Sequence, residues 1–337
     1  MTPEEKAIES REFDILIVGG GPAGLSTWLH LQREDPGLAA RTLLIEKAVY
    51  PRDKLCGGGI IPQADQVLHD LGVDLQVPAV LIQHVDYVFG PHRLRWSDPH
   101  AFRVVRRSQF DQALARAAVE RGLTLHEDEA FQRFERSGEA VCVETSRGRY
   151  RVRALVGADG ALSSVRRAMN LRETPRISRL LEILTPTSPR NLPQFSSGTV
   201  VFDFTSVAAG LQGYIWDFPC LDAGIPSFNY GIFDSRVCPA RPLAKLHKVF
   251  AEALQARECL QVPFTWSSHP ERWFAREGVY AQPNILLVGD AAGVEPTFGE
   301  GISYALRYGR SAALYLVYSC RRGDFSFQDY RDRLLAS

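Results

Sequence analysis

The sequence predicts an α/β fold in two parts, because three apolar strand segments each run into a glycine-rich turn. Residues 14–24 read Asp-Ile-Leu-Ile-Val-Gly-Gly-Gly-Pro-Ala-Gly, a short buried strand followed by a turn and the start of a helix. Strand segments with a similar ending return at residues 154–160 and 283–293. Residues 171–275 carry alternating and aromatic patterns instead. The pattern therefore predicts a helix-covered parallel sheet built from distant segments, together with a second α+β unit.

The first glycine-rich turn has the spacing of a dinucleotide-binding site. Gly19 permits a tight turn, Gly21 lets phosphate groups approach the backbone, and Gly24 lets the next helix pack closely. The helix begins near Pro22 and Ala23, so that its positive N-terminal end faces the anion. The segment predicts a Rossmann-like unit that holds a pyrophosphate.

An acidic residue follows at the position expected for ribose binding. The apolar strand at residues 42–45 ends in Glu46, about 20 residues after the last glycine. A carboxylate there accepts a hydrogen bond from the adenosine ribose. We assign Glu46 and its neighbour Lys47 to the cofactor. An ordinary glycine-rich turn is the weaker alternative, because strand, helix and carboxylate occur together.

Composition argues against several other classes of protein. The 337 residues carry 39 basic and 39 acidic side chains, so the overall charge predicts no nucleic-acid partner. The polar N-terminus predicts a cytoplasmic location. The most apolar helix segment, residues 312–320, is too short to cross a bilayer. Six cysteines without paired metal-ligand spacing predict free thiols and no metal site.

The segment between the first two glycine turns also has regular patterns. Apolar residues at helical spacing over 108–121 predict a helix with Ser108 as its cap. Residues 123–127 predict a strand, and alternation over 131–156 predicts a β-meander.

Two later strand ends add polar groups to the same predicted site. Asp159 and Gly160 end one strand, and Gly289 and Asp290 end another. Asp290 is suited to bind a ribityl hydroxyl group. A helix cap or turn residue is the alternative for each aspartate, and it is compatible with a cofactor role.

A last glycine pair opens another helix. Gly299 and Gly301 precede a helix that starts near Ile302. The positive end of this helix is suited to lie beside a flavin ring, whose reduced form is anionic.

In this order, the motifs resemble those of FAD-dependent oxidoreductases of the para-hydroxybenzoate hydroxylase type. The resemblance spans residues 13 to about 315. It implies FAD as the cofactor, Arg107 as a further flavin contact, and NAD(P)H as an electron donor that has no Rossmann unit of its own.

Two further segments are similar to those of geranylgeranyl reductases, flavoenzymes that saturate isoprenoid double bonds. Residues 50–60 contain their Cys-Gly-Gly segment at Cys56, and Tyr214, Trp216 and Phe218 match their Tyr-x-Trp-x-Phe-Pro motif. On a strand, these three aromatic side chains project from one face and form a wall for a flat or elongated apolar substrate. An aromatic core stripe is the alternative.

The resemblance makes Cys56 a candidate catalytic residue near the flavin. Arg52 and Lys54 flank it, and their charges favour its thiolate. An inert structural thiol is the alternative. Arg52 and Lys54 are equally suited to bind FAD phosphates or a substrate diphosphate, and their spacing does not decide between these uses.

The domain boundaries follow from these segments. We assign a discontinuous FAD-binding domain to residues 11–79, 101–170 and 276–325. The substrate domain takes residues 80–100 and 171–275, and a C-terminal helix takes residues 326–337.

The predicted substrate domain is built on a mixed or antiparallel sheet. Its strands are predicted at residues 195–207, 213–218 and 227–233, and a helix is predicted at 243–257.

The leading functional prediction is an FAD-dependent reductase that reduces C=C bonds of an apolar, isoprenoid-type substrate. The protein then has to align the reacting carbon, exclude water and position an acid. An NAD(P)H- and O2-dependent monooxygenase acting on an aromatic or other electron-rich small molecule is the main alternative, and a non-catalytic FAD-binding protein is a third. A halogenase is disfavoured, because the aromatic motif departs from the halogenase pattern at Tyr214 and Phe218.

Some properties stay open at this point. A lipid substrate implies peripheral contact with a membrane. The chain ends soon after Gly301, whereas many of the similar reductases continue further, so a smaller or more open pocket is expected. The sequence names neither the substrate nor the oligomeric state.

Overall fold

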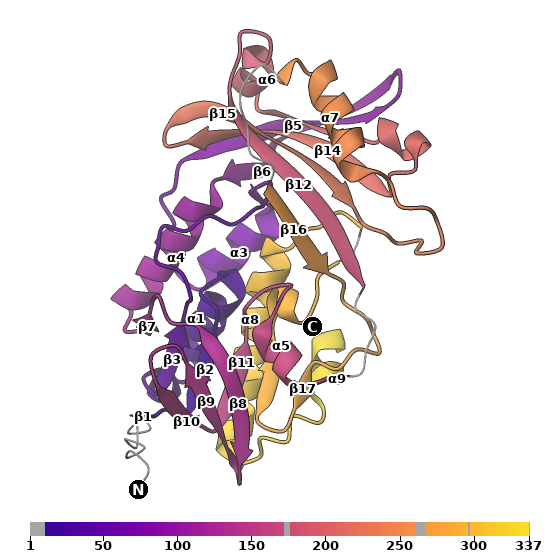
Figure 1. Cartoon of the computed structure of the whole chain (residues 1–337). Coiled ribbons are helices and arrows are strands. Elements are labelled where there is room, and N and C mark those ends of the chain that lie inside the picture. The colour runs from indigo at the N-terminus through magenta and orange to yellow at the C-terminus, as the bar shows by residue number, and fades with distance from the viewer. Residues whose placement is uncertain (1–10, 172–175, 260–266, 296, 337) are drawn as a thin grey trace, which may run out of the picture.

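Three sheets organise the described part of the chain, and two of them carry the predicted site (Figure 1). This computed structural model describes residues 11–171, 176–259, 267–295 and 297–336. The parts of the predicted domains at 172–175 and 260–266, together with residues 296 and 337, lie outside the described residues. The predicted α/β class with a second, mixed-sheet unit is confirmed.

The first sheet contains the glycine-rich turns. Its six strands lie in the order β17-β18-β11-β2-β3-β7, and all neighbours are parallel except β17 and β18. The strands are β2 (Ile15–Val18), β3 (Thr42–Ile45), β7 (Thr124–His126), β11 (Ala154–Gly157), β17 (Ala281–Gln282) and β18 (Ile285–Leu287). β2, β3, β11 and β18 are apolar and buried throughout, as expected for parallel strands covered on both faces.

Helices cover this sheet and complete its core. The longest, α8 (Ile302–Arg322), packs along α1 (Pro22–Glu34), which also contacts α4 (Arg107–Glu120). The shorter helices near this sheet are α2 (Pro36–Ala39), α3 (Pro62–Asp70), α5 (Ser164–Ala168) and α9 (Tyr330–Ala336).

A four-stranded sheet contributes side chains to the same core. Its order is β1-β10-β9-β8, with β1 (Arg11–Glu12), β8 (Phe131–Ser137), β9 (Ala140–Thr145) and β10 (Arg149–Val152). β8, β9 and β10 form antiparallel pairs, so the predicted meander is confirmed.

The third sheet has eight strands in the order β16-β12-β15-β14-β13-β5-β6-β4. All neighbours are antiparallel except β13 and β5, so the sheet is mixed. The strands are β4 (Gly59–Ile60), β5 (Ala79–Phe89), β6 (His92–Val105), β12 (Ile177–Pro186), β13 (Thr199–Asp203), β14 (Gly213–Asp222), β15 (Ile225–Asp234) and β16 (Ser267–Arg272). β4 and the end of β6 pair into this sheet although they fall in ranges assigned to the FAD-binding domain.

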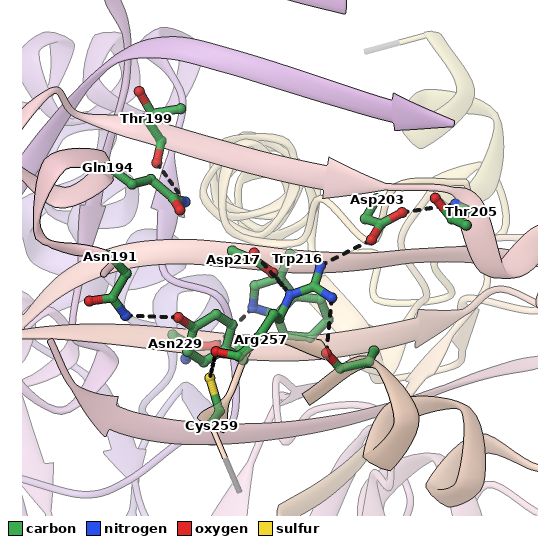
Figure 2. A network of polar contacts seen from close by, with 12 residues as sticks. Asn191, Gln194, Thr199, Asp203, Thr205, Trp216, Asp217, Asn229, Arg257 and Cys259 are labelled. Atoms are coloured by element: carbon green, nitrogen blue, oxygen red, sulfur yellow. Dashed lines mark hydrogen bonds and ion pairs between the residues drawn. The ribbon is translucent and has the colours of Figure 1, made fainter. Parts of the chain in front are cut away.

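The eight-stranded sheet has an outer and an inner face. On the outer face, α7 (Leu246–Ala256) packs over β15, and α6 (Leu192–Ser196) lies nearby (Figure 1). Arg257, at the end of α7, donates hydrogen bonds to Asp217 at 2.8 and 3.0 Å and to Asp203 at 3.1 Å (Figure 2). These contacts tie the helix to β14 and β13 and leave the inner face directed toward the glycine-rich turns.

Several element boundaries differ from the predicted ones. The strand predicted at 195–207 is shortened to β13, because the helix α6 with Pro193 in its first turn precedes it and Gly198, at φ +58°, ends that helix. Ser108 is not the cap of α4, whose cap position is Arg106. The predicted C-terminal helix starts only at Tyr330, since Phe327 adopts a left-handed φ of 55°.

Candidate functional site

The glycine-rich turn after β2 is shaped by close backbone contacts. Gly19 has φ +112°, and a Cβ atom there would lie 2.4 Å from the carbonyl oxygen of Ala158. A Cβ on Gly24 would lie 2.0 Å from the carbonyl oxygen of Gly19. By contrast, a Cβ on Gly21 would meet only Arg52 Nη2, at 3.7 Å. Packing therefore requires glycine at 19 and 24, whereas Gly21 borders open space. Pro22 and Ala23 form the buried first turn of α1.

Two acidic residues surround the Arg52 side chain next to this turn. Glu46 is 5% exposed and accepts hydrogen bonds from the backbone N–H of Gly20 at 2.8 Å and of Ala48 at 3.1 Å. Arg52 Nε lies 3.5 Å from Glu46 Oε2, and its Nη2 lies 3.2 Å from Asp111 Oδ2. Glu46 thus fixes the turn and still faces a cation.

Arg107 starts α4 and is buried beside the same acid. Its Nε and Nη2 each donate a hydrogen bond of 2.8 Å to the carboxylate of Asp111. Burial opposes the charge of Arg107, but the Asp111 carboxylate outweighs it and raises the pKa of the guanidinium. Asp111 of α4 thus pairs with both Arg52 and Arg107 and holds these two cations in the site. Lys47, next to Glu46, is exposed.

The second and third strand ends meet the first turn. A Cβ on Gly19 would lie 2.9 Å from the backbone nitrogen of Asp159, and a Cβ on Gly289 would lie 2.6 Å from Ala23 Cβ. The carboxylate of Asp159 accepts hydrogen bonds from the backbone N–H of Ser164 at 2.6 Å and of Val165 at 3.1 Å, so it binds the first turn of α5, next to the N-cap residue Ser163.

Gly160, with φ +80°, has no heavy atom within 4 Å of its would-be Cβ. The structure therefore brings the predicted strand ends together while turning the Asp159 carboxylate toward α5.

The loop before α8 lies next to Asp290. A Cβ on Gly301 would be 3.7 Å from Asp290 Oδ1. The carboxylate of Glu295 accepts hydrogen bonds from the backbone N–H of Phe298 at 2.6 Å and of Glu300 at 3.2 Å. These two bonds hold the loop before α8 in a tight turn. Ile302, the first residue of α8, is buried at 5% exposure.

Cys56 lies in a short loop that is hydrogen-bonded to side chains of the eight-stranded sheet. Its backbone N–H donates a hydrogen bond of 3.0 Å to Glu182 Oε2 on β12, and its carbonyl accepts one of 3.2 Å from Asn229 Nδ2 on β15. Asn229 Nδ2 also lies 3.2 Å from Glu182 Oε2, and Asn229 Oδ1 accepts a hydrogen bond of 2.8 Å from Trp216 Nε1 (Figure 2). Three strands thus fix one loop.

Lys54 acts on Cys56 in the expected direction, but the net outcome, a thiolate, is not what the structure favours. Burial raises the pKa of the Cys56 thiol, and Arg107 and Lys54 offset this effect only in part. The side chain therefore stands in the site as a neutral thiol. All six cysteines are unpaired in the structure.

The aromatic residues of β14 share the inner face, as alternation predicts. Tyr214, Trp216 and Phe218 are 6%, 5% and 8% exposed, and their ring centroids are 6.3 and 6.4 Å apart in sequence order. A Cβ on Gly57 would lie 3.2 Å from the Phe218 ring, so the Cys56 loop packs on this wall. The Tyr214 hydroxyl donates a hydrogen bond to the carbonyl of Phe298, which joins the wall to the loop before α8.

A second group on the inner face is polar. Glu271 and His269 lie on β16, and the charges of Lys54 and Asp290 act on the pKa values of both. Burial raises the pKa of Glu271 to about 8 and lowers that of His269 to about 4. Burial likewise raises the pKa of Glu182 to about 7. Glu271 therefore holds its proton near neutral pH, whereas Glu182 is protonated only in part.

Sequence reasoning missed Glu182, Asn229, Glu271 and Asp111. A weak signal exists for the first two, since each is a polar residue at a buried-face position of an apolar strand. Asp111 follows Arg107 by one helical turn, a spacing that favours an ion pair. Glu271 shows no comparable pattern, because its strand is short and polar throughout.

The described residues fit a dinucleotide cofactor. The open space at Gly21 borders Arg52, whose buried Nε lacks a hydrogen-bond partner within the described part of the chain. Residues 12–321 match the family described as FAD binding domain. The chain belongs to this family.

The relatives include reductases, a rifampicin monooxygenase of Streptomyces venezuelae and a tryptophan 2-halogenase of Chondromyces crocatus. The chain is 26% identical over 342 residues to digeranylgeranylglycerophospholipid reductase 3 of Methanosphaera stadtmanae, covering 96% of this chain and 82% of the relative. It is 29% identical over 327 residues to menaquinone reductase of Mycobacterium tuberculosis, covering 89% of this chain and 75% of the relative.

A geranylgeranyl bacteriochlorophyll reductase-like protein from Thermoplasma acidophilum has the same fold, with a TM-score of 0.80 at 21% identity over 97% of this chain and 83% of that one. The resemblance to geranylgeranyl reductase-like flavoproteins is thereby confirmed, and the chain is an FAD-dependent oxidoreductase.

Proposed function

We propose that this oxidoreductase reduces C=C bonds of an elongated, apolar substrate of the isoprenoid type. The observation that carries the proposal is the length of the aromatic surface. From Tyr214 it continues to Phe202 at 5.1 Å and on to Tyr87 at 5.8 Å between ring centroids. Leu94, which pairs with Tyr87, is 65% exposed. In this proposal, an apolar chain follows this row of rings from the exposed hairpin to the Cys56 loop.

Two of the relatives support the same substrate class. Their names state a digeranylgeranylglycerophospholipid and a menaquinone as what they reduce. Both names describe substrates with long apolar chains, for which an extended aromatic surface is suited.

In this proposal the glycine-rich turns hold FAD. Gly19, Gly21, Gly24 and Arg52 bind its pyrophosphate, with Pro22 and Ala23 opening the helix behind it. Glu46 and Lys47 lie at the adenosine end. Asp290, Gly299, Gly301 and Ile302 surround the flavin end, with Arg107, Asp159, Gly160 and Gly289 in support. Bound FAD supplies two-electron hydride transfer. NAD(P)H is the proposed electron donor.

The chain's own residues position the substrate and exclude water. Tyr214, Trp216 and Phe218 present apolar rings on which the alkene lies flat. Cys56, held by Glu182 and Asn229, contributes a neutral thiol that contacts the reacting carbon atoms. A site of this kind aligns a substrate that offers no polar handle.

We place the protein in the cytoplasm in this proposal. Its β5–β6 hairpin is suited to contact a membrane peripherally. Phe89, Leu94 and Trp96 on this hairpin are 51%, 65% and 48% exposed. Of the described helices, none combines the length and apolar character needed to cross a membrane. A lipid substrate can then pass from the bilayer along the aromatic surface.

The test is anaerobic stopped-flow absorbance of chemically reduced, FAD-loaded protein mixed with a geranylgeranyl lipid or diphosphate. Reoxidation without oxygen, with a saturated product by mass spectrometry, is expected. Reoxidation only after an oxygen pulse, with a hydroxylated product, would contradict the proposal and identify a monooxygenase. A folded, FAD-loaded protein that NAD(P)H cannot reduce would point to a non-catalytic flavin-binding protein.

A further inference from the structure

Glu271 occupies a position that the reaction described so far does not use. It lies on β16, at the edge of the inner face. Its Oε2 is 2.8 Å from where a Cβ on Gly299 would lie, and Gly299 has φ +67°. Oε2 is buried and has no hydrogen-bond partner among the residues that the structure describes. A buried carboxyl oxygen without a partner is costly unless it carries a proton or serves a function.

The surroundings of Glu271 keep it protonated. Burial is the largest cause that raises its pKa, to about 8, and the negative charges of Asp290, Glu295 and Glu300 act in the same direction. Lys54 is the cation that opposes them. His269, on the same strand, is neutral because burial lowers its pKa to about 4.

The carboxyl lies between the two parts of the proposed site. Gly299 belongs to the loop proposed to border the flavin, and the preceding residue, Phe298, accepts the hydrogen bond of Tyr214. The electrostatic influence of Glu271 also reaches the Tyr214 side chain. Glu271 is therefore next to both the cofactor loop and the first ring of the substrate wall.

We propose that Glu271 is the acid that protonates the substrate during reduction; this inference rests on the proposed function. Saturation of a C=C bond adds a hydride to one carbon and a proton to the other. Bound, reduced flavin would supply the hydride with its electron pair. The O–H bond of Glu271 breaks as its proton forms the second C–H bond. The resulting carboxylate recovers a proton from solvent before the next turnover.

Lys54 has a part in the same step. After proton transfer, Glu271 is an anion among three other carboxylates, and Lys54 is the cation that acts on it. Burial lowers the pKa of Lys54, but the negative charges of Asp290 and of ionised Glu271 oppose this effect and favour the ammonium form. Lys54 therefore lowers the cost of the transfer without donating the proton itself.

The experiment compares Glu271→Gln with the native FAD-loaded protein. Glutamine keeps the size of the side chain but has no acidic proton to give. The expected result is a fall of about 10²- to 10⁴-fold in formation of saturated product. The rate of flavin reduction by the electron donor should stay unchanged. Glu277→Gln, an exposed position a few residues further along, is the control and should leave both rates unchanged.

A spectroscopic readout tests the same group without turnover. Infrared difference spectra of the FAD-loaded protein should contain the C=O band of a protonated carboxyl group that disappears as the pH rises through about 8. The band should be absent from Glu271→Gln and present in Glu277→Gln. Product formation by the native protein should fall over the same pH interval.

The outcomes separate this inference from the proposed function. Equal rates of product formation by the native protein and Glu271→Gln would overturn the role of Glu271 and leave the reductase proposal standing. Absence of the infrared band at neutral pH would also overturn it. If the native protein yields no saturated product, the proposed function itself fails, and the proton-donor role fails with it.

Discussion

The inner face of the eight-stranded sheet has two halves that differ in chemistry. The polar half, on β12, β15 and β16, consists of Glu182, Asn229, His269 and Glu271. The aromatic half, on β14, β13 and β5, consists of Tyr214, Trp216, Phe218, Phe202 and Tyr87. The polar half contacts loops that carry Cys56 and Gly299, whereas the aromatic half extends to an exposed hairpin.

This difference suggests separate roles: the polar half positions the loops of the site, and the aromatic half accommodates the substrate chain. Hydrogen bonds have narrow distance and angle requirements, so the polar half fixes a few atoms in place. Apolar ring surfaces attract without such requirements, so the aromatic half accepts chains of variable length. The two halves meet at Trp216, whose ring belongs to the aromatic half and whose Nε1 donates to Asn229 in the polar half.

The largest effect is expected from removing this junction. Trp216→Ala should reduce the free energy of unfolding by about 3–5 kcal/mol, because it opens a cavity and leaves Asn229 Oδ1 without its donor. Urea denaturation measures the change. Trp96→Ala is the matched control, since Trp96 is 48% exposed, and it should change stability by less than about 0.5 kcal/mol. Equal losses of unfolding free energy in the two variants would contradict the role of Trp216 as the link between the two halves.

A smaller effect, with a definite pH dependence, is expected in the polar half. The pKa of Glu182 rises from its ordinary 4.5 to about 7 on folding. The group therefore favours folding below its unfolded pKa, and this contribution is lost as the pH rises through 7. Relative to Glu182→Gln, the native protein should lose up to roughly 3 kcal/mol of stability between acid and alkaline pH. Denaturation at several pH values measures it.

The control for this prediction is Glu252→Gln, an exposed position on α7. It should give the same stability difference from the native protein at each pH. A difference between the native protein and Glu182→Gln that does not change with pH would mean that Glu182 is not buried as described.

The next effect comes from crowding the junction instead of emptying it. A Cβ on Gly231 would lie 1.9 Å from Trp216 Cζ2, so Gly231→Ala should displace the indole and cost about 1–3 kcal/mol. The displacement should also increase the alkylation rate of Cys56, which Asn229 holds in place. Peptide mass mapping distinguishes this thiol from the other five. Unchanged alkylation would show that the two halves are independent.

The smallest effect on stability is expected at the far end of the aromatic half. Leu94→Ser, at a 65% exposed position, should change the free energy of unfolding by less than about 0.5 kcal/mol. Binding to phosphatidylcholine vesicles should nevertheless weaken by about tenfold, because about 1.5 kcal/mol of apolar contact is lost. Vesicle sedimentation measures this. Unchanged vesicle binding would show that the β5–β6 hairpin does not contact the membrane.

The sequence predicted the cofactor part of the molecule better than the substrate part. Gly19, Gly24 and the strand before them form a local pattern with one physical interpretation, and β2 and α1 appear as expected. Asp290 is likewise brought next to Gly301. The polar half of the inner face was not predicted, because Glu182, Asn229 and Glu271 are brought together by strand pairing across long separations. The pKa of Cys56 was misjudged for a related reason, since burial is a property of the folded chain.

The order of the strands in the first sheet also concerns how the protein is made. β2 is synthesised first, but its neighbour β11 begins at Ala154, and the neighbour of β11, β18, begins at Ile285. Parallel pairing over such separations forms slowly. The parallel sheet that carries Gly19 is therefore completed only after β18 has been synthesised. Until then, β11 presents an unpaired edge that is open to wrong partners.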